Sequence, residues 1–91
     1  MKPFQELMSV FANLKDTGEM TLFFQEILTP KEIEAVTLRW QLLKELHNGK
    51  TQRSIATQHK LSLCKITRGS KLLKQNNSIT KKILDTLKER K

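Results

Sequence analysis

The chain has 91 residues and a net charge of +8, which limits it to one small domain with a strongly basic composition. Its single cysteine, Cys64, cannot form an internal disulfide, which is typical of a reducing cytosol. No run approaches the roughly 20 apolar residues that a membrane span requires, so we expect a cytoplasmic protein with no membrane partner. A monomer of this size would bury little surface, which favours a core shared with a second copy.

Apolar periodicity predicts two helices at the start of the chain. Apolar residues recur every three or four positions over residues 4–14, which indicates an amphipathic helix. Residues 16–18 break the pattern, and a short, densely apolar helix is predicted over 20–28. We expect this second helix to be buried nearly all round, in a core or against a partner chain. The aromatic residues assigned to the core are Phe4, Phe11, Phe23 and Phe24.

A longer helix is predicted from Pro30 to about His47. Thr29 can cap this helix, Pro30 suits its first position, and Glu32 completes a capping box. The residues that end it are Asn48 and Gly49. As the longest predicted element it is a candidate spine, on which Trp40 is expected in the core or a dimer interface.

The second half of the chain predicts three more helices. A short helix begins at about Gln52, a break falls near residues 60–62, and another helix covers residues 63–74. Residues 75–78 form a turn, in which Ser78 can cap a last helix over residues 79–89. Because no strand pattern and no internal repeat occurs in the sequence, the predicted fold class is all-α.

Charge is distributed very unevenly along the chain. Residues 1–49 hold five Lys/Arg and seven Asp/Glu, for a net charge of −2, whereas residues 50–91 hold twelve and two, for +10. Residues 50–74 contain seven basic residues and no acid. Such a segment indicates a polyanionic partner, most often nucleic acid. From composition alone, a solvated basic face that aids solubility is an equal alternative.

Residues 52–71 fit a helix-turn-helix, the two-helix unit that reads double-stranded DNA. Ile55 and Ile66 would pack the two helices together, while Ala56 would let them cross closely. Ser62 is a suitable cap for the second helix. The match is imperfect, because Lys60 stands where the turn often has glycine and His59 stands where an apolar residue is usual. We expect His59 to be a partly buried packing residue.

Basic residues would supply affinity for phosphates, and a few side chains near the start of the second helix would read bases. Arg53 and Lys65 could reach guanine, and Gln52 could reach adenine. Lys60, Lys71 and Lys74 are better candidates for phosphate. The complete set of expected DNA-contacting residues is Gln52, Arg53, Lys60, Ser62, Cys64, Lys65, Thr67, Ser70, Lys71 and Lys74.

Two blocks of sequence resemble the tryptophan (Trp) operon repressor family. They are LTPKEIEAVTLRWQLLKEL at residues 28–46 and TQRSIATQHKLSLCKITRGSKLLK at residues 51–74. The resemblance implies a single domain over residues 1–91 that forms a six-helix, intertwined homodimer. Its parts would be dimerisation core helices at 1–49, a helix-turn-helix at 50–74 and a C-terminal core helix at 78–90. The implied function is transcriptional repression of tryptophan-related genes.

The resemblance also implies L-tryptophan as corepressor, bound between the core and the reading heads. Arg39 and Arg68 would flank the indole, and Arg68 would pair with the carboxylate. A guanidinium is suited to both tasks, because it stacks on aromatic rings and binds carboxylates. The other implied ligand-binding residues are Gly69 and Leu43, with Leu28 and Thr29 of the other subunit. On the residues alone, both arginines could instead be solvated or contact phosphate, and Gly69 could serve close helix packing.

The chain departs from the family pattern at several positions. Leu72 stands where the family typically has a serine that helps to hold the tryptophan ammonium, and Glu26 replaces an apolar residue of the segment that closes the pocket. The connection between the long helix and the first helix of the helix-turn-helix, at residues 49–51, is one residue shorter than in the family. Cys64 and Lys65 replace smaller, uncharged side chains. The sequence therefore identifies neither the effector nor the operator sequence.

Two other functions are consistent with the sequence. One is a helix-turn-helix regulator of the same fold that is independent of tryptophan or uses another effector. The other is a helical interaction module whose basic face binds RNA or an acidic protein. An enzyme is not expected, because the sequence has no Gly-rich phosphate loop, no metal-ligand cluster and no suitably spaced His and Cys. We therefore expect no catalytic residue, no metal and no cofactor other than tryptophan as a ligand.

Overall fold

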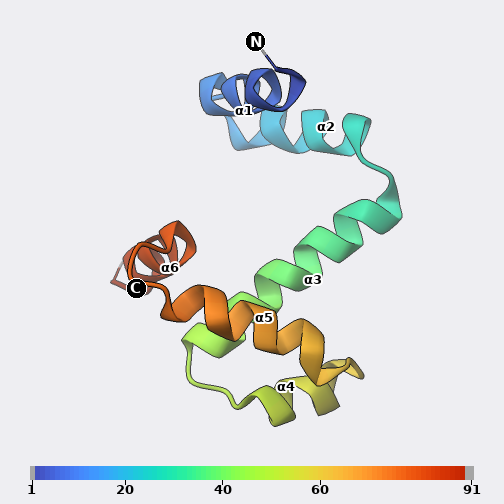
Figure 1. Cartoon of the computed structure of the whole chain (residues 1–91). Coiled ribbons are helices and arrows are strands. Elements are labelled where there is room, and N and C mark those ends of the chain that lie inside the picture. The colour runs from blue at the N-terminus through green and yellow to red at the C-terminus, as the bar shows by residue number, and fades with distance from the viewer. Residues whose placement is uncertain (1, 90–91) are drawn as a thin grey trace. The chain divides into compact units, whose positions relative to one another are not determined.

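The computed structural model describes residues 2–89 as a chain of helices joined by short turns (Figure 1). This part of the chain contains no strand, so the predicted all-α class is confirmed. The helices are α1 (Pro3–Asn13), α2 (Thr17–Ile27), α3 (Pro30–His47), α4 (Gln52–His59), α5 (Leu63–Lys74) and α6 (Ile79–Glu89).

From residue 30 onward the helices begin and end where the sequence predicts. The main difference is α2, which begins at Thr17 rather than Met20. Its cap is Asp16, whose carboxylate accepts a hydrogen bond of 3.1 Å from the backbone N–H of Gly18. The residues that the pattern identified as a break are therefore the cap and first turn of α2, because side-chain capping outweighs the poor helix propensity of glycine.

Predicted caps are present at the starts of α3 and α6. The backbone N–H of Thr29 donates to Glu32 Oε1 at 2.8 Å, and the N–H of Glu32 donates to Thr29 Oγ1 at 3.2 Å. At α6, Ser78 Oγ accepts from the backbone N–H of Lys81 at 3.1 Å. Ser62 has the extended backbone of a cap, but within residues 2–89 its side chain makes no capping hydrogen bond.

The chain divides into two compact units within α3, one ending at Val36 and the other beginning at Thr37. In the first unit, Phe11 of α1 packs edge-to-face on Phe23 and Phe24 of α2, with ring centroids 5.2 and 6.0 Å apart. Phe4 was expected in the core but is 69% exposed, because it lies in the first turn of α1, away from this cluster.

Several apolar side chains of α2 are not buried by their neighbours in the first unit. Within the described residues, neither α1 nor α2 contains a buried residue. Leu22 is 62% exposed and Ile27 is 44% exposed. The burial expected for residues 20–28 is therefore not provided within the described residues of the first unit.

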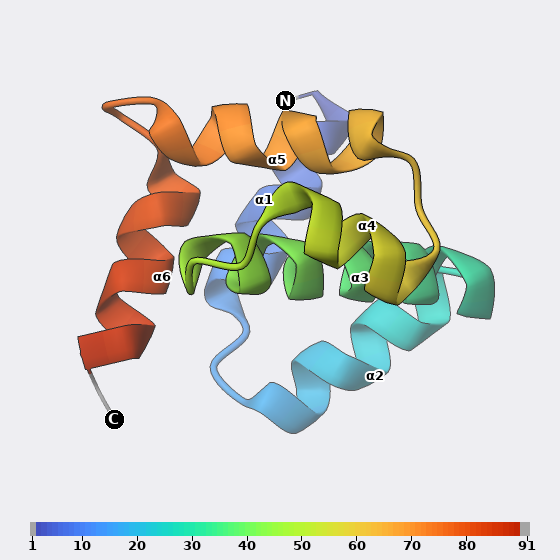
Figure 2. The same ribbon diagram turned by 90° about the horizontal axis from the view of Figure 1, so that it is seen from below.

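The second unit contains a small, well-defined core where α4 and α5 pack on the later part of α3 (Figure 2). Ile55 and Ile66 are 0% and 1% exposed, as the helix-turn-helix pattern predicted. Leu42 of α3 packs against both of them. The half-buried residues around this cluster are Leu38, Leu46, Ala56 and Leu61.

Helix α6 is held in place by the buried side chain of Leu84 and by the carboxylate of Asp85. Leu84 of α6 is buried, whereas Trp40 of α3 remains 37% exposed. Asp85 bridges His47 Nε2 at 2.6 Å and Lys81 Nζ at 2.9 Å. The hydrogen bond from His47, and then that from Lys81, holds the pKa of Asp85 below its ordinary value. A side chain of α6 is thereby fixed to the end of α3.

Candidate nucleic-acid interface

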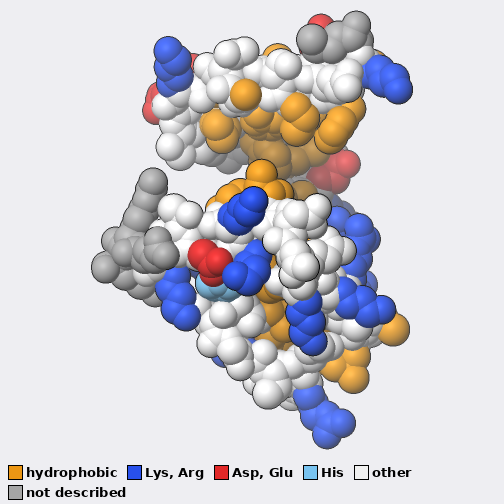
Figure 3. Space-filling view, turned by 60° about the vertical axis from the view of Figure 1, so that its left-hand side comes forward, with side chains coloured by type: hydrophobic (Ala, Val, Ile, Leu, Met, Phe, Trp, Pro, Cys, Tyr) orange, Lys and Arg blue, Asp and Glu red, His pale blue; other side chains and the backbone are white. Residues whose placement is uncertain are grey.

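Helix α5 presents one face to the core and a polar, basic face to solvent. Ile66 is buried on the inner face, and its neighbours Gly69, Ser70 and Leu73 are half-buried. The exposed residues are Leu63, Cys64, Lys65, Arg68, Lys71 and Lys74. Lys and Arg side chains are spread over the second unit, whereas apolar side chains gather on the visible face of the first (Figure 3).

The start of α4 brings two of the predicted contact residues next to each other. Thr51 caps the helix, with its Oγ1 accepting from the backbone N–H of Ser54 at 3.1 Å. Arg53 is exposed, and Gln52 is half-buried because its side chain reaches α5. Gln52 Oε1 lies 2.9 Å from the hydroxyl oxygen of Thr67. Thr67, one of the expected DNA-contacting residues, is half-buried and faces α4.

The turn between α4 and α5 requires an unusual backbone conformation. Lys60 has φ 55° and ψ 46°, the left-handed region that glycine adopts without strain. Its N–H donates to the carbonyl of Ala56, which closes the end of α4. Lys60 and Ser62 are both exposed in this turn. The position at which such turns often have glycine is thus strained here and carries a charge.

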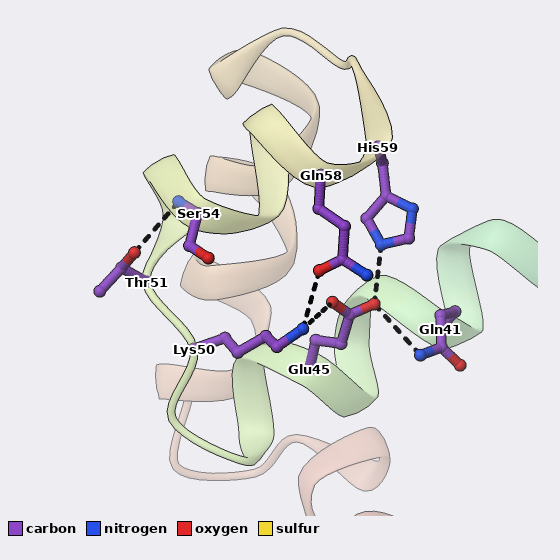
Figure 4. A network of polar contacts seen from close by, with 7 residues as sticks. All are labelled: Gln41, Glu45, Lys50, Thr51, Ser54, Gln58 and His59. Carbon is purple, nitrogen blue, oxygen red and sulfur yellow. Dashed lines mark hydrogen bonds and ion pairs between the residues drawn. The ribbon is translucent and has the colours of Figure 1, made fainter.

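A buried carboxylate fastens α4 to α3 (Figure 4). Glu45 is only 6% exposed, and its Oε2 accepts from His59 Nε2 at 2.8 Å and from Gln41 Nε2 at 3.1 Å. Its Oε1 accepts from Lys50 Nζ at 3.1 Å, and Lys50 also donates to Gln58 Oε1 at 2.8 Å. Because an ionised carboxylate only accepts, His59 Nε2 carries the proton in this contact.

These contacts determine the ionisation of Glu45. Burial by itself would raise the pKa of this carboxyl group, but the hydrogen bonds from His59, Lys50 and Gln41 together lower the pKa further than burial raises it. Glu45 is therefore ionised at neutral pH and holds α4 by charge-assisted hydrogen bonds. His59 is partly buried, as the sequence predicted, but it is a hydrogen-bonding residue as well as a packing one.

One feature of the sequence indicates a buried carboxylate at this position. Glu45 follows Leu42 by three residues, so it lies on the same inward face of α3 as the buried leucine. A carboxylate at such a position needs partners, because an unpaired buried charge is costly. Its partners in α4 cannot be identified from spacing alone, since they depend on how α4 packs on α3.

Gly69, which the resemblance places against a ligand, lies directly on two leucines of α3. A Cβ atom added to Gly69 would be 3.2 Å from Leu46 Cδ1 and 3.3 Å from Leu43 Cδ2. Such distances are tighter than ordinary van der Waals contacts, so the glycine permits close approach of α5 to α3. The close helix packing considered for Gly69 is therefore present, and Leu43 is one of its two partners.

The other residues of the implied ligand set are placed differently. Arg39 on α3 and Arg68 on α5 are exposed, and Leu72 on α5 is half-buried. Leu28 and Thr29 lie at the junction of α2 and α3, in the first unit. Thr29 uses its hydroxyl to cap α3. Of this set, Gly69 and Leu43 lie against each other in the second unit.

A groove of about 330 Å³ lies where the end of α3 meets α5 and α6. Two expected DNA-contacting residues, Ser70 and Lys74, line it. Two further lysines in its wall, Lys50 and Lys81, are bound to Glu45 and Asp85. The charge of this groove is therefore largely neutralised by the protein itself.

Among the described residues, no group of three His, Cys, Asp or Glu side chains could hold a metal ion. No helix in this part of the chain is both long and apolar enough to cross a membrane. These findings concern residues 2–89 only.

The fold and the site define a small all-helical protein that presents a basic helical pair on a compact core. The model of the family described as Trp repressor protein matches residues 2–88, and the chain belongs to this family. No solved structure matches it significantly. Because the family is regulatory and not enzymatic, membership indicates a DNA-binding regulator.

Several known proteins are similar to this chain over most of their length. A Trp operon repressor homolog of Vibrio campbellii is 32% identical over 89 residues, covering 97% of this chain and 89% of its own. A Trp operon repressor homolog of Xylella fastidiosa is 35% identical over 75 residues, covering 81% and 82%. The uncharacterized protein YerC of Bacillus subtilis is 30% identical over 88 residues, covering 97% and 85%. The relatives thus include proteins with and without an assigned role.

Proposed function

We propose that this protein is a homodimeric transcriptional repressor that binds operator DNA through α4 and α5, with L-tryptophan as corepressor. The observation that carries the proposal is family membership over residues 2–88 combined with the acid-free, basic surface of residues 50–74. In this arrangement α5 is the reading helix, and α4 crosses the DNA backbone with Arg53, near its start, reaching a base edge. The exposed apolar side chains of α2 supply part of the dimer interface.

The DNA-binding part of the proposal is tested with duplexes selected by the protein from a random pool. Arg53 is the second residue of α4 and is exposed. We therefore expect Arg53→Ala to change base preference and to weaken the free energy of specific binding by about 1–3 kcal/mol. Lys74→Ala should weaken all duplexes alike and flatten the dependence of affinity on salt. Equal affinity of the unmodified protein for selected and scrambled duplexes would instead favour the interaction module.

The corepressor part is tested by calorimetric titration with L-tryptophan, with indole-3-acetate as a comparison that lacks the amino group. We expect L-tryptophan to bind and to strengthen binding to the selected duplex. A ligand shifts such an equilibrium only by its differential affinity for the two states. Arg68→Ala should remove the response, since its guanidinium would pair with the ligand carboxylate. An unchanged response would refute this assignment.

A second candidate is a DNA-binding regulator of the same family that does not respond to tryptophan. Two observations favour it. Gly69 is closely packed on Leu43 and Leu46, so side chains of this chain already lie against the glycine. Leu72 also lacks the hydroxyl that the family typically provides for the ligand ammonium. Under this candidate, affinity for DNA is the same with and without L-tryptophan.

A further inference from the structure

The contact between Gln52 and Thr67 joins the first residue of α4 to the middle of α5. Gln52 Oε1 and Thr67 Oγ1 are 2.9 Å apart, although fifteen residues separate them. The same hydroxyl lies 2.8 Å from the backbone carbonyl of Leu63, one turn earlier in α5. Both residues were expected to contact DNA directly, so their contact with each other changes what each can do.

A threonine hydroxyl has one hydrogen and here two acceptors. If the hydrogen points to Gln52 Oε1, the side-chain amide of Gln52 turns its NH₂ group outward. If it points to the Leu63 carbonyl, the hydroxyl oxygen accepts from an amide turned the other way, and Gln52 presents its carbonyl. In either case one end of the Gln52 amide is bonded to Thr67 and is directed toward α5, so that both ends cannot face a base together.

This geometry disfavours the reading of adenine by Gln52. Such reading is bidentate: the amide NH₂ donates to the base N7 while the amide oxygen accepts from the base N6. A phosphate, in contrast, needs only the NH₂ group and would select the arrangement in which Thr67 donates to Gln52. Arg53 beside Gln52, and Lys71 one turn after Thr67 on the same face of α5, are both exposed and basic.

We infer that Gln52 is a phosphate-contacting residue and that Thr67 is a positioning residue, which holds the Gln52 amide with its NH₂ group directed to the DNA backbone. The inference rests on the proposed function, since it requires that α4 and α5 bind duplex DNA. Thr67 then acts on DNA binding through Gln52, in place of the direct contact with DNA that its position in the sequence suggested.

The test measures fluorescence anisotropy on a selected duplex and on a scrambled duplex of the same composition. Thr67→Val keeps the shape of the side chain and removes the hydroxyl, and Gln52→Ala removes the amide. Each should weaken binding to both duplexes by about three- to tenfold, the worth of one hydrogen bond. The double variant should be no weaker than Gln52→Ala alone, because Thr67 acts only through Gln52.

Two further variants separate positioning from a structural effect. Thr67→Ser keeps a hydroxyl and should restore affinity. Thr86→Val is the matched control, because Thr86 Oγ1 also lies within hydrogen-bond distance of the carbonyl one turn earlier, that of Lys82 at 2.9 Å, but belongs to α6. It should bind both duplexes as the unmodified protein does. The melting temperature of Thr67→Val should stay close to that of the Thr86→Val control.

Several outcomes would overturn the inference. Loss of affinity in Gln52→Ala for the selected duplex alone would show base reading, and unchanged affinity in Thr67→Val would exclude positioning. The NMR signals of the Gln52 side-chain amide in DNA-free protein must also shift in Thr67→Val, or the contact is absent in solution. If that shift occurs but the unmodified protein binds no duplex, the proposed function fails and the inference fails with it.

Discussion

Single residues with unusual backbone or packing demands set the geometry of the second unit. Lys60 adopts the left-handed conformation that lets α4 turn into α5, and Gly69 lets α5 approach α3. The sequence suggested both positions, one as a departure from the usual turn glycine and the other as a glycine inside a helix. What it did not give was the partner of Gly69, because the contact with Leu43 and Leu46 joins segments distant in the chain.

Replacement of Lys60 by glycine should stabilise the protein. An L-residue in the left-handed region costs about 1–2 kcal/mol, and glycine removes this cost but loses more conformational freedom on folding. We expect Lys60→Gly to raise the free energy of unfolding by about 0.5–1 kcal/mol in urea denaturation. Lys65→Gly, inside α5, should lower it by about 1 kcal/mol, as helix glycines do. A Lys60→Gly variant less stable than the unmodified protein would contradict the conformational argument.

Enlargement of Gly69 should separate α5 from α3. A Cβ there already approaches the two leucines to 3.2 and 3.3 Å, so the branched side chain of valine cannot be accommodated without displacing them. We expect Gly69→Val to lower the free energy of unfolding by about 1–3 kcal/mol, as overpacking does. Lys71→Val, on the exposed face of the same helix, controls for the helix propensity of valine. Equal effects of the two substitutions would show that Gly69 is not a packing contact.

At the scale of whole helices, α4 is fastened by two different means. The core of Ile55, Ile66 and Leu42 supplies non-directional apolar burial, and the Glu45 network fixes α4 by directed hydrogen bonds. The periodicity of the sequence was sufficient to predict the apolar core, since both isoleucines were predicted to be buried. The same periodicity could not predict the Glu45 network. In the sequence Glu45, Lys50 and His59 are ordinary charged or polar residues, and only the packing of the helices brings them together.

Loss of the Glu45 charge should weaken the attachment of α4. Glu45→Gln leaves Lys50 and His59 without an ionised acceptor, so we expect the free energy of unfolding at pH 7 to fall by about 2 kcal/mol. Glu34→Gln, on the exposed surface of α3, is the matched control and should change the free energy of unfolding by less than about 0.5 kcal/mol.

The same variant gives a pH dependence with a definite sign. The pKa of Glu45 is lower in the folded protein than its ordinary value of 4.5, so the unfolded chain binds this proton first as the pH falls. The stabilisation from Glu45 is thus complete above that value and is lost as the pH drops through the folded pKa. We expect the stability difference between the unmodified protein and Glu45→Gln to shrink below pH 4.5. A constant difference would contradict the lowered pKa.

For the whole molecule, the distribution of charge and of uncovered apolar residues points to two kinds of partner. The acid-free, basic residues 50–74 carry α4 and α5, and the largest sets of exposed apolar side chains occur on α1, α2 and α6. On α6 these are Ile79, Ile83 and Leu87, spaced four residues apart and therefore on one face. A contiguous apolar stripe is typical of a protein–protein interface, which agrees with the proposed homodimer.

A charge placed in this stripe should weaken self-association. If α6 packs against a second copy, Ile83→Glu removes a buried apolar side chain and buries an unpaired carboxylate. We expect the dimer dissociation constant from sedimentation equilibrium to rise about tenfold or more. Lys82→Glu adds acidic charge beside the stripe and should leave self-association nearly unchanged. A dimer unaffected by Ile83→Glu would place the interface elsewhere.

The sequence by itself determined the helices, most of their ends and the basic character of the second half, because hydrophobic period, caps and charge are local properties. It also identified the family through the blocks at residues 28–46 and 51–74. Only the tertiary structure decided that Glu45 is buried among Lys50 and His59, that Gly69 rests on two leucines, and that Thr67 turns toward Gln52. These are contacts between helices, and they exist only once the packing of Ile55 and Ile66 has set the distances between helix surfaces.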